Sequence, residues 1–469
     1  MAQKWTTSDL VLALAIRPGA RLGVRMQAAL RDAVRGGVLR PGDILPPTRE
    51  LAVELGVARG TVVHVYEQLA AEGYLVAQPG GRTRVASGAT PSAGSAKPAR
   101  AAASPRLDLR PGVPDLRRFP AGDWAWAYAE ATRSIGAADV DYGDGRGRPR
   151  ARAAVADHLR RVRAADTDPD RVVLCLGFAQ ALTLLLPALA ERGVRVLAVE
   201  DPGDRAIDVV AQAAGVALAP IPVDADGLRV ELLDQAQAQA VLVTPAHQSP
   251  TGVVLSASRR RELIAWAART GGWIIEDDYD SEFRYDRQPI GALQGLAPAR
   301  VVLVGSASKS HAPAVRTAWI AAPSALIDVL AARRRVADRG GPVLGELAFA
   351  ALLDSGRHDK HVRAMRAVYA ARRETVLDAL ARLGRDLVLT GVSAGFHGVL
   401  ELPVGADESA VVAAAAARGV RVVGLGSFAR NRGDLPPSLV IGFGDIDGEG
   451  VRDALPRLRD AIDQAMGRR

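Results

Sequence analysis

The chain has 469 residues, of which 48% are hydrophobic and 24% charged, a length that favours two or three globular domains. Its single cysteine, Cys175, excludes an internal disulfide and a cysteine-based metal site, which is consistent with a reducing compartment. The N-terminus lacks a signal-peptide pattern and no apolar run reaches membrane-spanning length. These features favour a cytoplasmic protein.

Positive charge is concentrated in the first quarter of the chain. Residues 1–106 carry 14 Lys and Arg against 7 Asp and Glu, whereas the rest of the chain carries 46 against 45. A basic segment beside a nearly neutral remainder is typical of attraction to nucleic acid. A solvated basic surface without a partner would have the same composition, so both interpretations remain open at this point.

The first 86 residues contain several short elements. Residues 21–39 have apolar positions at helical spacing and predict a helix. Thr48 is expected to cap a second helix over 50–55, and a third helix is expected to start near Ala58 after a glycine turn. Two short helices joined in this way match a helix-turn-helix, and residues 73–85 predict a β-hairpin that would form its wing.

Residues 20–86 also carry the pattern G-x-L-x-P-G-x-x-L-P-x-x-R-x-L-A followed by R-x-T-V-x-x-x-Y-x-x-L-x-x-x-G. This resembles the winged helix-turn-helix of the GntR family of bacterial transcription regulators. The resemblance implies DNA contacts by Arg49, Arg59, Thr61 and the wing residue Arg82. For His64, a position facing the DNA groove and plain solvent exposure are equally open, whereas Tyr66 is expected to pack in the core.

The remainder of the chain has a different character. Residues 87–106 are rich in Ala, Ser and Pro without hydrophobic periodicity, and predict a flexible linker between domains at 1–86 and 107–469. The segments predicted to be buried parallel strands, with helices between them, are 172–176, 194–199, 240–243, 273–275 and 301–304. This is an α/β doubly wound pattern, followed from about Ser324 by a smaller α+β lobe.

An acidic run follows the strand predicted at 273–275. It reads E-D-D-Y-D-S-E-F-R-Y, with four acids within five positions that repel one another unless a cation partners them. A metal ion is one candidate, although no histidine or cysteine ligand set lies nearby in the sequence. A buried positive heterocycle is the other, with Asp277 facing a pyridine nitrogen and Tyr279 supplying a phenol to a ring hydroxyl.

Lys309 lies in the small-residue turn S-A-S-K-S after the last predicted strand. A lysine there forms a Schiff base if burial lowers its pKa, and Arg316, seven positions later, can hold a phosphate with its planar fork. The turn at Gly177, which opens a helix, also suits a phosphate. Taken separately, these are more often a solvated lysine and an ordinary strand–helix turn.

The order of these motifs is informative. A phosphate loop, a P-T-G loop, an acid-plus-tyrosine motif and S-x-S-K-x-x-x-P-x-x-R follow one another in 107–469. The segment resembles the fold-type I pyridoxal-phosphate aminotransferases, with a large α/β lobe and a small C-terminal α+β lobe. Together with the N-terminal domain, the whole chain resembles the MocR subfamily of GntR regulators, for which E-D-D-Y-D-S-E-F-R-Y is distinctive.

The resemblance implies a role for each motif residue. Lys309 would carry pyridoxal 5′-phosphate as a Schiff base, Asp277 would pair with the pyridine nitrogen, and Tyr279 would contact the ring hydroxyl. The residues implied at the phosphate are Gly177, Phe178, Ala179, Ser306 and Arg316, with Tyr142 reaching in from the other subunit of a homodimer. No metal is expected.

The implied function is a pyridoxal-phosphate-dependent, DNA-binding transcription regulator. It would sense an amine, an amino acid or the cofactor itself by aldimine formation, and would bind a double-stranded DNA operator. The alternative is an active aminotransferase with an accessory DNA-binding domain. Whether the chain turns over a substrate is therefore left open.

Several positions depart from the aminotransferase pattern. Ser249 stands where an asparagine is usual, and Asp204 replaces the aromatic residue that usually stacks on the cofactor ring. Val440 occupies the place of the arginine that usually grips a substrate α-carboxylate. Arg430 and Arg432, in a nearby loop, are candidate substitutes for an effector carboxylate, and a solvated loop is the alternative for both.

Overall fold

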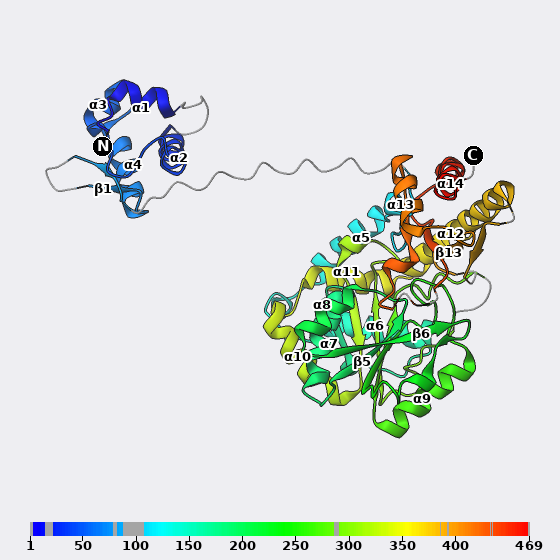
Figure 1. Ribbon diagram of the computed structural model, residues 1–469. Helices are drawn as coiled ribbons and strands as arrows, with labels where there is room; N and C mark the ends of the chain where they lie inside the picture. The colour runs from blue at the N-terminus through cyan, green and yellow to red at the C-terminus, as the bar shows by residue number, and fades with distance from the viewer. Residues whose placement is uncertain are drawn as a thin grey trace. The chain divides into compact units, whose positions relative to one another are not determined.

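The protein is described here by a computed structural model that covers residues 3–14, 22–77, 82–87, 107–285, 290–384, 386–391, 394–431, 433 and 435–467. The chain forms two compact units, residues 1–103 and 104–469 (Figure 1). Most of the expected linker, 88–106, lies outside the described residues, as does Arg432.

The N-terminal unit contains four helices and a two-stranded antiparallel sheet among its described residues. Their bounds are α1 (Thr7–Leu14), α2 (Leu22–Arg35), α3 (Thr48–Glu54), α4 (Arg59–Ala71), β1 (Leu75–Val76) and β2 (Arg84–Val85). Buried leucine and valine side chains from all four helices and both strands form one core. The Tyr66 hydroxyl donates to the Pro46 carbonyl at 3.1 Å, which confirms core packing for this ring.

One expectation about the helix starts was wrong. Helix α3 begins at Thr48 itself, and Pro47 occupies the capping position, where it provides no side-chain hydrogen bond. Pro47 is extended, with ψ of 142°, and helical geometry begins at the next residue, so the threonine that the sequence pattern assigned to the cap is the first residue of the helix. Helix α4 starts after Ala58 as expected, also without a side-chain cap.

The large lobe of the C-terminal unit contains an eight-stranded sheet, ordered β4-β11-β10-β9-β8-β5-β6-β7. Its strands are β4 (Val172–Cys175), β5 (Val196–Asp201), β6 (Ala217–Asp224), β7 (Gly227–Leu228), β8 (Ala240–Val243), β9 (Trp273–Asp278), β10 (Val301–Ser306) and β11 (Ala318–Ala321). All five predicted strands are present. The parallel pairing predicted for β4 was wrong, because the unpredicted β11 lies between β4 and β10, antiparallel to both. The short connection from β10 to β11 leaves no room for the helical crossover that parallel pairing needs.

Helices cover both faces of this sheet (Figure 1). Helices α7 (Phe178–Ala190), α8 (Ala206–Ala213) and α10 (Ser324–Asp338) pack on the face that carries Val302 and Val304. Helices α6 (Pro149–Arg163) and α11 (Val343–Asp354) pack on the opposite face, which carries Leu303, and α9 (Ala257–Thr270) packs there on Val301. Helix α5 (Ala121–Ser134) packs against α11. This two-faced cover is the doubly wound arrangement that the sequence predicts.

The small lobe contains a four-stranded antiparallel sheet, ordered β12-β13-β16-β15. The remaining elements are β3 (Leu107–Asp108), α12 (Arg357–Leu383), β12 (Val388–Thr390), β13 (His397–Glu401), α13 (Glu408–Ala417), β14 (Val420–Arg421), β15 (Val423–Gly424), β16 (Ser438–Gly442) and α14 (Gly448–Ala465). Strand β3, where the described part of this unit begins, pairs with β14. Short 3-10 helices lie at Leu116–Arg118, Ala137–Asp139, Pro169–Arg171, Val230–Leu232, Pro313–Val315 and Leu425–Ser427. Within the described ranges, we find no helix with the length and apolar character needed to cross a membrane.

Candidate functional site

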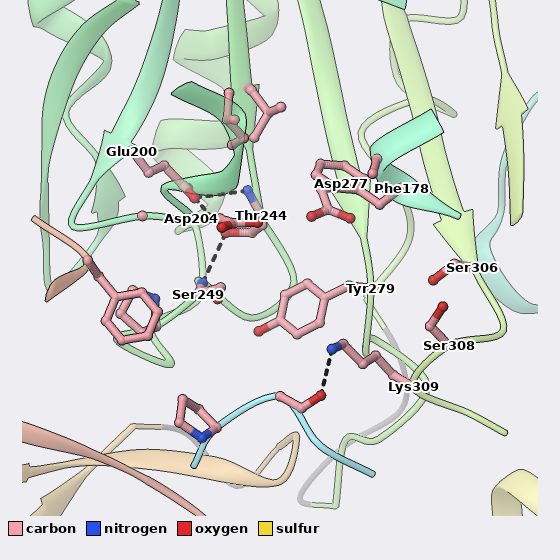
Figure 2. A pocket seen from close by; sticks show the side chains of 18 of the residues that line it. Phe178, Glu200, Asp204, Thr244, Ser249, Asp277, Tyr279, Ser306, Ser308 and Lys309 are labelled. Atoms are coloured by element: carbon pink, nitrogen blue, oxygen red, sulfur yellow. Dashed lines mark hydrogen bonds between the residues drawn. The ribbon is translucent and has the colours of Figure 1, made fainter. Parts of the chain in front are cut away.

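The carboxyl ends of β5, β8, β9 and β10 meet at one edge of the large sheet, beside a cavity of about 430 Å³ (Figure 2). Seven of the residues predicted for the cofactor site line this cavity: Phe178, Ala179, Asp277, Tyr279, Ser306, Lys309 and Arg316. Residues that the sequence did not predict also line it, and they include Pro111, Gly112, Glu200, Thr244, Ser308, His397 and Phe428. The P-T-G loop contributes Ser249 and Pro250, so four separate motifs converge on one cavity, as expected for the switch region of an α/β sheet.

The acidic run begins within the last residues of β9, and its side chains are divided between the two faces of the strand. Asp277 and Tyr279 line the cavity, whereas Glu276 accepts the Leu293 and Gln294 backbone N–H groups, each at 3.0 Å. Asp278 forms a buried ion pair with Arg163 at 2.7 Å. Because strand side chains alternate, neighbouring acids acquire different partners, which reduces the repulsion that the sequence suggested.

The side chain of Asp277 lines the cavity. Burial, and then the negative charges of Asp278 and Asp204, hold the pKa of Asp277 well above its usual range, and the charge of Lys309 opposes this. A buried carboxyl in this position is stabilised as an anion only by a nearby positive group. The cavity is thus suited to a ligand that brings a cationic N–H to Asp277.

Lys309 lies in the loop after β10 and donates from Nζ to the Gly112 carbonyl oxygen at 2.6 Å (Figure 2). Burial lowers the pKa of Lys309, while the charges of Asp280, Asp277 and Asp204 oppose that change. A lysine with a lowered pKa is more often in the neutral, nucleophilic form. Lys309 is therefore a buried lysine at the cavity, and the alternative of a solvated surface lysine is wrong.

Gly177 and Arg316 form a tight corner at the start of α7. Gly177 has φ of 110°, and a Cβ added there would lie 3.0 Å from the Arg316 guanidinium, so a larger residue would push the arginine away. Helix α7 begins at the next residue, and its first backbone N–H groups have no partner within the helix. A guanidinium beside a helix N-terminus is suited to phosphate.

Glu200, near the end of β5, is a buried residue of the cavity wall. It accepts the Thr244 hydroxyl at 2.5 Å and the Gln248 amide at 3.2 Å. Burial raises the pKa of Glu200 to about 7, although these hydrogen bonds act in the opposite direction. The Ser249 backbone N–H in turn donates to the Thr244 hydroxyl oxygen at 3.2 Å, so Glu200 and Thr244 anchor the P-T-G loop.

We expect Glu200→Gln to flatten part of the pH dependence of stability. An acid with a raised folded-state pKa gives stability that is complete below its unfolded pKa and is lost as the pH rises through the folded value. Between about pH 4.5 and about pH 7, wild-type unfolding free energy should therefore fall relative to Glu200→Gln by on the order of 3 kcal/mol. Urea unfolding of both proteins across this range measures the difference, and parallel curves would contradict the prediction.

Asp204, one of the unusual positions, and Arg430, a candidate for an effector carboxylate, lie where loops of the two lobes meet. Asp204 lines the cavity and accepts the Ala206 backbone N–H at 2.9 Å. The Arg430 guanidinium binds Asp208 at 2.5 Å and the Asp204 carbonyl at 2.7 Å. Arg430 thus holds the Asp204 loop, and its contact with an effector carboxylate stays a prediction. The matching prediction for Arg432 lies outside the described residues.

Tyr142 is not among the residues that line this cavity. Tyr142 is 65% exposed, and its ring centroid lies 5.5 Å from the guanidinium carbon of Arg339. It borders a separate hollow with Gly143, Arg148 and Gly340. Its predicted contact with the phosphate site of a second subunit stays a prediction.

The residues predicted at the DNA lie at the surface of the N-terminal unit. Arg49, Arg59, His64 and Arg82 are exposed, and Thr61 is half-buried. The Thr61 methyl group faces Gly23, where an added Cβ would lie 3.1 Å from it. Arg59 and Thr61 are in the first turn of α4, so the start of this helix presents them together.

Comparisons with known proteins agree with this two-part organisation. Residues 15–85 match the model for bacterial regulatory proteins of the gntR family, and residues 117–439 match the model for aminotransferase class I and II. The pyridoxine biosynthesis transcriptional regulator PdxR of Corynebacterium glutamicum is 34% identical over 97% of this chain and 99% of its own. The chain belongs to the MocR-type regulators of the GntR family. The resemblance seen in the sequence is thereby confirmed.

Other MocR-type proteins and solved aminotransferases give the same result. The probable rhizopine catabolism regulatory protein MocR of Rhizobium meliloti is 32% identical over 92% of each chain. The solved structure of Pyrococcus horikoshii kynurenine aminotransferase is similar over 77% of this chain and 92% of the aminotransferase chain. The TM-score is 0.70 and the sequence identity 24%. Thermus thermophilus LysN, an α-aminoadipate aminotransferase, gives a TM-score of 0.69 at 23% identity and covers 77% and 93%. These similarities confirm the fold-type I fold of the C-terminal unit.

Proposed function

We propose that this MocR-type regulator binds pyridoxal 5′-phosphate in the cavity around Lys309 and controls transcription according to the ligand held there. The observation that carries the proposal is the convergence of Lys309, Asp277, Tyr279 and Arg316 on one cavity. An amine, an acid, a phenol and a guanidinium in that arrangement match the polar groups of the cofactor. DNA binding belongs to the N-terminal unit, in keeping with its GntR-family match.

The residues present fit this cofactor. The raised pKa of Asp277 calls for a cationic N–H, which the pyridine nitrogen provides when protonated. The Gly177–Arg316 corner would hold the phosphate, together with Phe178 and Ala179 at the start of α7 and Ser306. When bound, the cofactor supplies an aldehyde carbon that condenses reversibly with a primary amine.

Each side chain then has a defined task. Lys309 offers its amine, whose pKa burial lowers, and Asp277 would hold a proton on the ring nitrogen. Burial, and then the charge of Asp280, raises the pKa of Tyr279 well above its usual value, so this phenol stays neutral against the ring hydroxyl. Arg316 fixes the phosphate with its planar fork.

The signal that this regulator reads is an amine, an amino acid or pyridoxal phosphate itself. Two observations favour the cofactor itself or an amine without a carboxylate. The relative from Corynebacterium glutamicum is named for pyridoxine biosynthesis, and Val440 packs with Val399 and Leu425 where aminotransferases have a carboxylate-binding arginine. The same substitution weighs against the alternative of an active aminotransferase. We place its action in the cytoplasm, as a homodimer in which Tyr142 reaches the partner's phosphate.

A visible absorbance spectrum of the purified protein with pyridoxal phosphate tests the proposal. Binding through Lys309 should produce a yellow band that changes on titration with the correct amine or amino acid. A mobility-shift assay with DNA from upstream of its own gene should respond to the same ligand. A colourless protein whose DNA binding ignores every ligand would overturn the proposal.

In the DNA-binding unit, we expect Arg49→Ala and Arg59→Ala each to weaken binding to a random-sequence DNA duplex. Both side chains are exposed, and each lost phosphate contact should reduce the slope of log K against log salt by about 1. Fluorescence anisotropy at several salt concentrations measures the slope. Arg31→Ala is the matched control, because Arg31 is held by Glu72 at 2.8 Å, and an equal loss in that variant would refute a specific role.

A further inference from the structure

A buried acid–imidazole pair lies directly behind Tyr279. His247 Nδ1 and Asp280 Oδ2 are 2.7 Å apart, and both side chains are 1% exposed. The Tyr279 hydroxyl lies 3.1 Å from the same Nδ1, and after burial the negative charge of Asp280 is the largest cause of the raised pKa of Tyr279. Three polar groups therefore meet at one point, and one of them, Tyr279, lines the cavity.

The fold brings these residues together from adjacent strands. His247 follows β8 and Asp280 follows β9, and these strands are parallel neighbours, so their carboxyl ends lie side by side. Gly395 of the small lobe packs against the pair and has φ of 63°. A Cβ there would lie 2.6 Å from Asp280 Oδ2, so the glycine permits this close packing.

The hydrogen-bond pattern determines which nitrogen of His247 carries a proton. An ionised carboxylate only accepts hydrogen bonds, so Nδ1 is the donor to Asp280. Nε2 of His247 has no hydrogen-bond partner among the described residues. A buried carboxylate that lost its N–H donor would favour its protonated form instead.

Asp280 also acts on Lys309. Among the charges that oppose the lowered pKa of Lys309, that of Asp280 is the largest, ahead of Asp277 and Asp204. Among the described residues, other titratable groups around the pair are Tyr279, Tyr285, Glu200 and His397. The ring centroids of His397 and His247 are 4.8 Å apart. Burial, and then the charges of His247 and Lys309, keep the pKa of His397 well below its usual value, so this ring is neutral.

We infer that His247 is a positioning residue for the cofactor site: it fixes Asp280 as a carboxylate, and this carboxylate orients the Tyr279 hydroxyl and holds a proton at the Lys309 nitrogen. The inference rests on the proposed function, because it assigns the pair a task toward a cofactor joined to Lys309. His247 and Asp280 are absent from the residues that line the cavity, so they act through Tyr279 and Lys309.

The test is a pH titration of the visible band of the protein loaded with pyridoxal phosphate. Asp280→Asn removes the charge, and His247→Leu removes the donor that maintains it. Both should lower the midpoint of the colour change by about one to three pH units. His247→Asn should remain within about half a unit of wild type, because its amide nitrogen can replace Nδ1 as the donor.

His358→Leu is the matched control. His358 is also a buried imidazole bound to a carboxylate, that of Glu282 at 3.1 Å, but neither residue lines the cavity. An unchanged midpoint in His247→Leu, or an equal shift in His358→Leu, would overturn the inference. A shift in His247→Asn as large as that in His247→Leu would also overturn it.

A second measurement needs no cofactor. In the unloaded protein, the Nδ1–H proton of His247 should give a low-field NMR resonance that is lost in His247→Leu and in Asp280→Asn. Absence of that resonance in the wild type would overturn the pairing itself. If the resonance is present but the protein forms no visible band, the proposed function fails, and the task inferred for the pair toward Lys309 fails with it.

Discussion

Replacing Lys309 by alanine is expected to abolish the visible absorbance band of the protein after incubation with pyridoxal phosphate and removal of the excess. The Lys309 amine is the group in the cavity that can condense with the cofactor aldehyde, and burial already lowers its pKa. The ligand response of DNA binding should disappear with the band. Absorbance after gel filtration and a mobility-shift assay with and without ligand measure the two effects.

Binding to random-sequence DNA should survive this substitution, because the N-terminal unit has its own core. Lys360→Ala is the matched control, since Lys360 is an exposed lysine on α12 and should leave the band unchanged. A Lys309→Ala protein that kept the band at wild-type intensity would show that another group holds the cofactor. Loss of DNA binding in Lys309→Ala would instead indicate general unfolding.

Seven of the residues that the sequence suggested for a cofactor line one cavity, because they belong to short continuous motifs at strand ends. Asp277 lies near the end of β9, Tyr279 follows that strand, and Lys309 follows β10, which pairs with β9 in parallel. The helix start at Phe178 could be read from the glycine before it. Parallel strands bring their carboxyl ends to one edge, which is why local patterns suffice here.

Other parts of the site depend on contacts that no local pattern contains. Gly112 reaches Lys309 across 197 positions, and Arg430 reaches Asp208 across 222. The only sequence signal for Gly112 was an ordinary Pro-Gly turn. The acidic run appeared to lack a histidine, yet the fold supplies His247 to Asp280 from the neighbouring strand. Periodicity predicts which face a residue takes, but it does not predict which distant residue it will meet.

The second large effect concerns stability. We expect Asp278→Ala to lower the free energy of unfolding of the C-terminal unit by about 3–5 kcal/mol. Asp278 pairs at 2.7 Å with Arg163, whose side chain is only 2% exposed. Without the carboxylate, a buried guanidinium keeps its charge and loses its main partner, which is costly in a low-dielectric interior. Urea unfolding followed by circular dichroism measures the change.

The size of this loss separates a buried ion pair from an exposed one. Asp453→Ala is the matched control: Asp453 is 50% exposed and pairs with Arg457 at 2.8 Å, so the loss should stay below about 1 kcal/mol. Replacing both buried partners, as in Asp278→Leu with Arg163→Met, should recover much of the stability, because no unpaired charge then remains. If the double variant were as unstable as Asp278→Ala, desolvation of Arg163 would not be the cause. Asp278 would then matter through the backbone of β9, which presents Asp277 to the cavity.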